Sequence, residues 1–170
     1  MDLTAGRSFD VVIYVENLYE GDLSRDSLDK VAAIHWQNWL KTWMQSLSLE
    51  TKIERDCELS LRLTSDRQMK TLNSQYRFLD KPTDVLAFAA AEAEIILPVE
   101  ITEPLYLGDL VISLDTAARQ ALEQNHSLVK ELAWLSSHGL LHLLGWDHPD
   151  EASLKQMLER QSELIQLLEI

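Results

Sequence analysis

The chain has little of what marks secreted, repetitive or multidomain proteins. Its 170 residues include a single cysteine, Cys57, so no internal disulfide can form. No charged-then-apolar segment at the start marks a secretion signal, so we expect a reducing, cytoplasmic location. No internal repeat or Gly/Ser-rich linker divides the sequence. Its length suits one domain, residues 1–170, with its own hydrophobic core.

The chain also lacks an uninterrupted hydrophobic run long enough to cross a membrane. Its most apolar stretch, residues 127–144, is broken by Lys130, Glu131 and two histidines. Charged side chains are costly inside a bilayer, so this stretch is interpreted as a buried helix of a globular protein. We therefore expect no membrane partner.

Basic residues are in short supply, with 15 Lys and Arg against 28 Asp and Glu and a formal net charge of −13. A general nucleic-acid binder needs clustered Lys and Arg side chains to contact phosphates, so no DNA partner is expected. Residues 65–81 are the exception, because Arg67, Lys70, Arg77 and Lys81 outnumber two aspartates there, giving 4 − 2 = +2. Any polyanion should be bound at this segment.

The hydrophobic pattern predicts one α+β domain with a mixed sheet of about four strands and about five helices. Alternating or β-branched residues predict strands over residues 9–15, 57–64, 84–88 and 105–113. Apolar spacings of three and four, with capping residues, predict helices over 24–47, 65–77, 114–123, 127–144 and from 149 to the end. The helix over 127–144 is expected at the centre of the fold.

Several positions in this pattern predict local structure. Ser65 and Gln68 have the spacing of a capping box. His35 falls on the tryptophan-rich face of the helix over 24–47 and is expected to be buried there. Gly108 indicates a β-bulge or a close backbone approach. The acidic stretch 89–104 is interpreted as a solvated hairpin or lid, with disorder as the alternative.

Residues 138–148 contain three of the five histidines. His138 and His142 are four apart, so on a helix they share one face and can reach one metal ion. Gly145 falls where the helix should stop, and a left-handed glycine there would let His148 swing back as a third ligand. Three neutral imidazoles suit zinc and leave a fourth coordination position open for water or substrate. An open position indicates a catalytic rather than a structural metal site.

The residue after the first histidine narrows the reaction class. In zinc peptidases with this spacing it is a glutamate that serves as general base, but here it is Gly139. Its absence disfavours peptide hydrolysis and favours phosphodiester cleavage, which depends largely on positioning and charge stabilisation. Arg77 is the expected catalytic and substrate-binding residue, because a guanidinium can bind two phosphate oxygens at once. Lys81 is a second candidate for phosphate binding.

The sequence also allows interpretations of Gly139, Asp147 and His126. Gly139 either permits close approach of another group or reflects tight helix packing. Asp147 either orients a ligand histidine or caps the following helix, whose first turn is expected to include Pro149. His126 is expected in an exposed loop.

Three blocks together carry a family resemblance: HGLLHLLGWDH (138–148), LNSQYRFLDKPTDVLAF (72–88) and LGDLVIS (107–113). They closely resemble the YbeY family of zinc-dependent endoribonucleases, and the match runs from about Phe9 to the end. The resemblance implies a single-strand-specific endoribonuclease that matures the 3′ end of small-subunit rRNA and acts in ribosome quality control. It implies as partners single-stranded rRNA precursors, the small ribosomal subunit and its proteins.

The same resemblance implies roles for particular residues. His138, His142 and His148 would hold one zinc ion per chain, and Arg77 would be the functional arginine. Either water or the RNA 2′-hydroxyl could serve as the attacking group.

Two other functions fit these residues. A zinc-stabilised, non-catalytic assembly factor could bind the small ribosomal subunit through protein contacts, which suits the net charge of −13. A metallopeptidase is the weaker alternative, because Gly139 replaces the usual general base.

Overall fold

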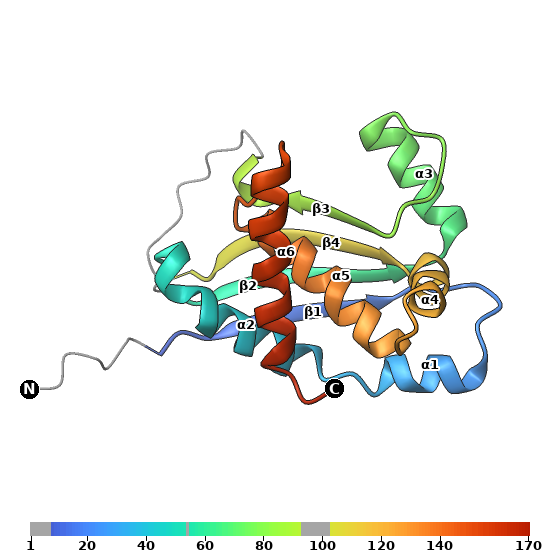
Figure 1. Cartoon of the computed structure of the whole chain (residues 1–170), viewed down its shortest axis with the longest axis horizontal. Coiled ribbons are helices and arrows are strands. Elements are labelled where there is room, and N and C mark those ends of the chain that lie inside the picture. Colours follow the sequence, from blue (N-terminus) through green and yellow to red (C-terminus); the bar gives the residue numbers. More distant parts are fainter. Residues whose placement is uncertain (1–7, 54, 93–102) are drawn as a thin grey trace, which may run out of the picture.

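A four-stranded mixed sheet packed with six α-helices forms the protein in this computed structural model, which describes residues 8–53, 55–92 and 103–170 (Figure 1). The strands are β1 (Val11–Asn17), β2 (Cys57–Thr64), β3 (Val85–Ala89) and β4 (Leu105–Ser113). The helices are α1 (Arg25–Ala32), α2 (Trp36–Thr51), α3 (Asp66–Arg77), α4 (Leu114–Glu123), α5 (Leu128–Leu143) and α6 (Glu151–Gln166), with a short 3-10 turn, η1 (Ala90–Glu92). The expected α+β class is confirmed, and no helix in these ranges is long and apolar enough to span a bilayer.

The strand order is β1-β2-β4-β3, with β3 antiparallel to β4 and the other pairs parallel. The alternation predicted for β2 is confirmed, because its apolar residues Cys57, Leu59, Leu61 and Leu63 all point into the main core. Helices α2 and α5 cover this core face, and α6 packs on α5. Helix α3 lies apart from them (Figure 1) and covers only part of the other face, which we call the open face.

Gly108 produces a bulge in β4, as its position in the strand predicted. Tyr106 pairs with Glu58 but Gly108 pairs with Leu59, so Leu107 is an extra residue in β4. The φ of Gly108 is +136°, and a Cβ there would lie 2.2 Å from the carbonyl oxygen of Phe88. Both the bulge and the close backbone approach are therefore confirmed.

The single helix predicted over 24–47 is wrong, because the structure has α1 and α2 joined by a turn at Ala33–His35. In the sequence, apolar Ala32 and Trp36 are four apart across this turn, so periodicity alone could not reveal the break. His35 is exposed and precedes α2 at its N-cap, so its expected burial is also wrong.

Two helix starts differ from the sequence prediction. Ser65 occupies the N-cap position of α3, but its side chain makes no capping bond, and Gln68 Oε1 instead accepts from Thr64 Oγ1 at 2.7 Å. The predicted capping box is therefore wrong, because Gln68 has a nearer partner. Helix α6 begins at Glu151 after a capping box between Asp150 and Ser153, so Pro149 lies before its first turn.

Helix α3 is tied to the start of α4 through Asp66. Its carboxylate accepts hydrogen bonds from Ser113 Oγ and Thr116 Oγ1, both at 2.6 Å, and from Arg119 Nη2 at 2.7 Å. Burial alone would raise the pKa of Asp66, but these three hydrogen bonds outweigh it and lower the pKa below its ordinary value. The cluster fixes the start of the helix that ends at Arg77.

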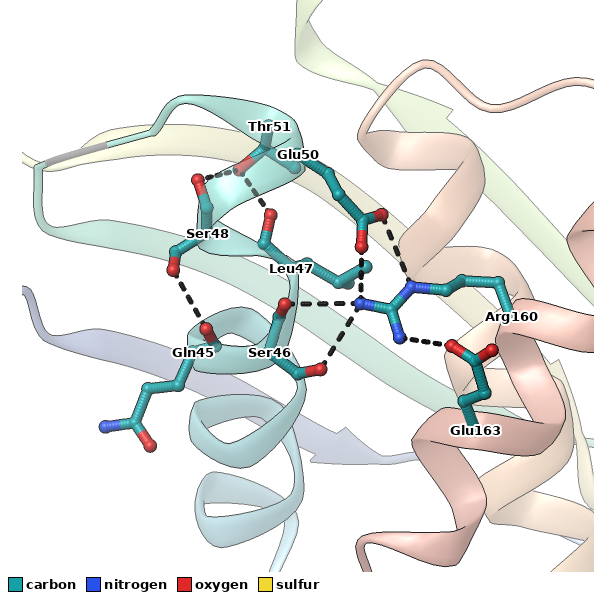
Figure 2. Close-up of polar contacts among 8 residues, drawn as sticks. All are labelled: Gln45, Ser46, Leu47, Ser48, Glu50, Thr51, Arg160 and Glu163. Carbon is teal, nitrogen blue, oxygen red and sulfur yellow. Dashed lines mark hydrogen bonds and ion pairs between the residues drawn. The ribbon is translucent and has the colours of Figure 1, made fainter.

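Helix α6 is tied to α2 through Arg160, whose side chain is only 14% exposed (Figure 2). Its Nη2 donates to the carbonyl oxygen of Ser46 at 3.2 Å and lies 2.7 Å from Glu50 Oε1. The indole of Trp43 adds a bond from Nε1 to the carbonyl oxygen of Leu164 at 3.0 Å. These contacts determine where α6 lies over the core.

We expect Asp66→Asn to lower the free energy of unfolding by about 1–3 kcal/mol at neutral pH, because it removes the charge that accepts three hydrogen bonds. The folded pKa of Asp66 lies below the unfolded value, so this stability is present above about pH 4. It is lost as pH falls through the folded pKa. Urea unfolding of the wild type and Asp66→Asn at neutral pH and at about pH 3 measures the difference in their free energies of unfolding.

Asp29→Asn is the matched control, because the Arg25–Asp29 pair is exposed and contributes little. If the deficit of Asp66→Asn did not shrink on acidification, the role assigned to its charge would be wrong.

Candidate metal centre

Helix α5 and the turn after it bring the three expected ligands together. Ser127 Oγ accepts from the Lys130 N–H at 3.1 Å and caps α5, as predicted. Gly145 has a φ of +95° after the helix end, as the expected chain reversal requires. One ligand atom each from His138, His142 and His148 lies within 4.8 Å of the others, so this group could hold a metal ion.

The hydrogen bonds of the two helical histidines favour metal binding. His138 Nδ1 lies 2.9 Å from Gln161 Oε1, and His142 Nδ1 lies 2.9 Å from the carbonyl oxygen of Trp146. Both partners are acceptors, so each neutral ring carries its hydrogen on Nδ1 and a lone pair on Nε2. The two Nε2 atoms face each other at 3.0 Å. Such facing lone pairs repel each other unless a cation lies between them, so the donor set fits a metal ion.

The charge state of His142 also suits a ligand. Burial lowers its pKa, and the neighbouring His138 and His148 rings lower it further, against a smaller opposite effect of the bond to Trp146. The ring is therefore neutral at neutral pH, which is the form that binds metals.

Gln161 is a site residue that the sequence interpretation missed. It is fully buried in α6, where its Nε2 donates to the carbonyl oxygen of Trp134 at 3.2 Å. That bond turns Oε1 toward His138. The available signal was its spacing, since Gln161 occupies the buried stripe of α6 between Met157 and Leu164.

A cavity of about 950 Å³ surrounds the three histidines, and we call it the metal cavity. Arg77 and Lys81 also line it, so the structure brings both predicted basic residues to the predicted histidines. Every one of the five residues expected in the site therefore faces the same hollow.

The turn after α3 carries the two basic residues to this cavity. Phe78 ends the helix with a left-handed φ of 58°, which is uncommon for a bulky residue. The carbonyl oxygen of buried Asn73 accepts the N–H groups of Phe78 and Leu79, and its Nδ2 donates to the carbonyl oxygen of Lys81 at 2.8 Å. Asn73 thus holds the turn between Arg77 and Lys81.

Gly139 is explained by packing. A Cβ at this position would lie 2.6 Å from Leu110 Cδ2 and 3.4 Å from Val85 Cγ2. Of the two alternatives, the structure favours tight packing of α5 on the sheet. The Cβ of a glutamate here would collide with Leu110, which would have to move to accommodate it.

The structure also shows the contacts of Asp147 and His126. Asp147 does not cap α6, since Asp150 does; Asp147 Oδ1 accepts from the His148 N–H at 2.8 Å and lines the metal cavity. His126 is not an exposed loop residue, because its side chain is 22% exposed and contacts the buried carboxylate of Glu131.

Most of the acidic stretch 89–104, interpreted from the sequence as a hairpin or lid, lies outside the described residues, at 93–102.

We expect Gln161→Leu to weaken metal binding about 10- to 100-fold, because His138 loses the acceptor that fixes its hydrogen on Nδ1. Leucine has a similar size and suits the buried stripe, so the fold should persist. Competition with a chromophoric chelator at neutral pH measures the affinity. Gln166→Leu, at an exposed position of α6, is the matched control; equal affinities in the two variants would contradict the orienting role.

Sequence comparisons connect the chain to one family of known proteins. Residues 23–169 match the family model described as Endoribonuclease YbeY. A protein named Endoribonuclease YbeY from Picosynechococcus sp. is 49% identical over 158 residues, which is 93% of this chain and 94% of the relative. Its namesake from Trichormus variabilis is 52% identical over 80% of this chain and 78% of the relative.

A solved structure is also similar. The solution structure of TM1509 from Thermotoga maritima gives a TM-score of 0.52 at 25% identity and covers 92% of this chain and 88% of that one. The fold and the sequence matches thus agree, and the chain belongs to the YbeY endoribonuclease family.

Proposed function

We propose that the chain is a zinc-dependent endoribonuclease that cleaves single-stranded rRNA precursors at the 3′ end of the small-subunit rRNA. Residues 1–170 would act as one domain in the cytoplasm, in rRNA maturation and ribosome quality control. The observation that carries this proposal is the metal cavity, in which a histidine group suited to a metal ion lies beside Arg77 and Lys81. Family membership supports the same reaction class.

Zinc is the proposed ion, and His138, His142 and His148 would hold it, one per chain. Three neutral imidazoles are a common donor set for catalytic zinc and leave one coordination position open. When bound, the ion supplies Lewis acidity toward a phosphate oxygen and makes a coordinated water more acidic. Gln161 and the Trp146 carbonyl keep both helical rings in the tautomer that presents Nε2 to the cavity.

Arg77 would bind the phosphate that is cleaved. Its guanidinium has a planar set of donors that matches two phosphate oxygens, and it carries its charge at every relevant pH. Asn73 holds the turn that follows, so the backbone that carries Arg77 has a defined course beside the metal cavity. Lys81 would add a second, less directional phosphate contact from the other end of the turn.

The acidic composition bears on substrate choice. A net charge of −13 repels RNA in general, so phosphate binding would be confined to the metal cavity. Contacts with proteins of the small ribosomal subunit would then help to deliver the correct precursor. The same charge favours a second candidate, a zinc-stabilised assembly factor that binds the small subunit without cutting RNA.

We expect Arg77→Ala to lower kcat/KM for single-stranded RNA about 10²- to 10³-fold, because a donor to the developing charge is lost. His142→Ala should reduce cleavage to background, because it removes a ligand. Single-turnover assays on an rRNA-derived oligonucleotide measure both effects. Arg67→Ala is the matched control, since Arg67 is exposed on the same helix but does not line the metal cavity.

Equal cleavage by all preparations would identify a contaminating nuclease and reject the proposal. Full genetic rescue of rRNA maturation by the cleavage-deficient Arg77→Ala protein would favour the assembly factor instead. The product ends distinguish the attacking group, since the RNA 2′-hydroxyl yields a cyclic phosphate and water does not.

We expect Lys81→Ala to weaken RNA binding to a similar extent for all single-stranded sequences, because a phosphate contact carries no base information. The slope of log K against log salt should become shallower by about 0.7. Fluorescence anisotropy over a salt series measures it. An unchanged slope would show that Lys81 makes no phosphate contact.

A further inference from the structure

Two hollows of the protein meet at a pair of aromatic side chains. The metal cavity is one of them, and the other is a hollow of about 710 Å³ on the open face of the sheet. Tyr76 and Phe88 line both. We call this pair the aromatic ridge, since it separates the metal cavity from the open face.

The two members of the aromatic ridge have different structural roles. Phe88 packs against a small hydrophobic cluster under α3, formed by Met69, Leu86 and Val111. Tyr76 is 59% exposed on the last turn of α3 and buries little surface. The two rings lie edge to face, with centroids 5.1 Å apart and planes at 65°. Phe88 therefore supports the Tyr76 ring from one side while much of that ring faces solvent.

An exposed aromatic ring that a neighbouring ring supports is suited to stacking on an unpaired base. Bases of single-stranded RNA stack on aromatic side chains, and each such contact strengthens binding about 5- to 150-fold. Bases within a duplex are already stacked on their neighbours and cannot reach such a ring without being extruded. A stacking residue beside the reaction centre would therefore select for unpaired RNA.

The position of Tyr76 links stacking to phosphate binding. Arg77 is the next residue and lines the metal cavity with Tyr76 and the histidine group. A base on Tyr76 would therefore bring an adjoining phosphate of its strand near the Arg77 guanidinium.

Beyond the aromatic ridge, the open face is unsuited to phosphates. Arg62 is paired with Glu16 at 3.4 Å. Tyr106 donates its hydroxyl to Asp109 Oδ1 at 2.6 Å, and Tyr14 donates its own to Glu58 at 3.2 Å. Here one basic residue, Arg62, faces three acidic residues, so this region is negatively charged. An RNA strand is therefore expected to stop at the aromatic ridge.

We propose that Tyr76, supported by Phe88, stacks on an unpaired base next to the phosphate bound by Arg77 and makes the site selective for single-stranded RNA. This inference rests on the proposed endoribonuclease function. Tyr76 is thus a substrate-positioning and specificity-determining residue, and Phe88 acts through it.

The test compares Tyr76→Leu with Tyr14→Leu. Tyr14 is a matched control because it is 56% exposed and lines the hollow on the open face but not the metal cavity. We expect Tyr76→Leu to weaken binding of a single-stranded oligonucleotide about 5- to 150-fold, measured by fluorescence anisotropy and single-turnover cleavage. Tyr14→Leu should bind within about twofold of wild type, because Tyr76 is unchanged. Tyr76→Trp should retain binding, because the indole is also a ring on which a base can stack.

A scan with single abasic nucleotides separates stacking from a structural effect. One abasic position should weaken wild-type binding by the same factor as Tyr76→Leu, and the variant should be insensitive at that position. If the two losses simply add, or if Tyr76→Leu behaves like Tyr14→Leu, the stacking role is wrong. An absence of RNA cleavage by the wild-type protein would instead reject the proposed function.

Discussion

The close contact between α5 and β4 is the constraint on which the site depends. Gly139 presents no side chain toward Leu110, so the helix can lie directly on the sheet. Each residue of a helix is rotated by about 100° from the one before it, so His138 and His142 both lie on one side of this contact, where they line the metal cavity. A larger residue at this position would require either Leu110 or the helix to move. The glycine therefore permits the close packing of the helix that carries the histidines.

The remaining parts of the site come from segments far apart in the sequence, and each is held by its own polar contact. Asp66 fixes the start of α3, and Asn73 fixes the turn after it. Arg160 ties α6 to α2, and the adjacent Gln161 reaches His138. Hydrophobic packing brings the elements together, whereas these directional bonds set the orientation of the functional side chains.

Local features of the structure could be predicted from the sequence, whereas several contacts between distant segments could not. The histidine spacing in 138–148 and the bulge at Gly108 follow from the geometry of a helix and a strand. The break within 24–47 left the hydrophobic period intact, and Gln68 found a partner in the preceding strand rather than at the helix start. The spacing of Gln161 places it in the buried stripe of α6, but the sequence does not reveal its partner His138 on another helix.

The bulge at Gly108 sets which face of the sheet each later residue of β4 meets. Tyr106 and Asp109 are three residues apart and would lie on opposite faces of a regular strand, yet their side chains are hydrogen-bonded. The extra residue shifts the alternation by one, and so Leu110 points to the core, where it supports α5. Removing one residue from this stretch would turn Leu110 to the open face. The length of β4 around Gly108 therefore matters as much as its side chains, because the pairing register places Leu110 under α5.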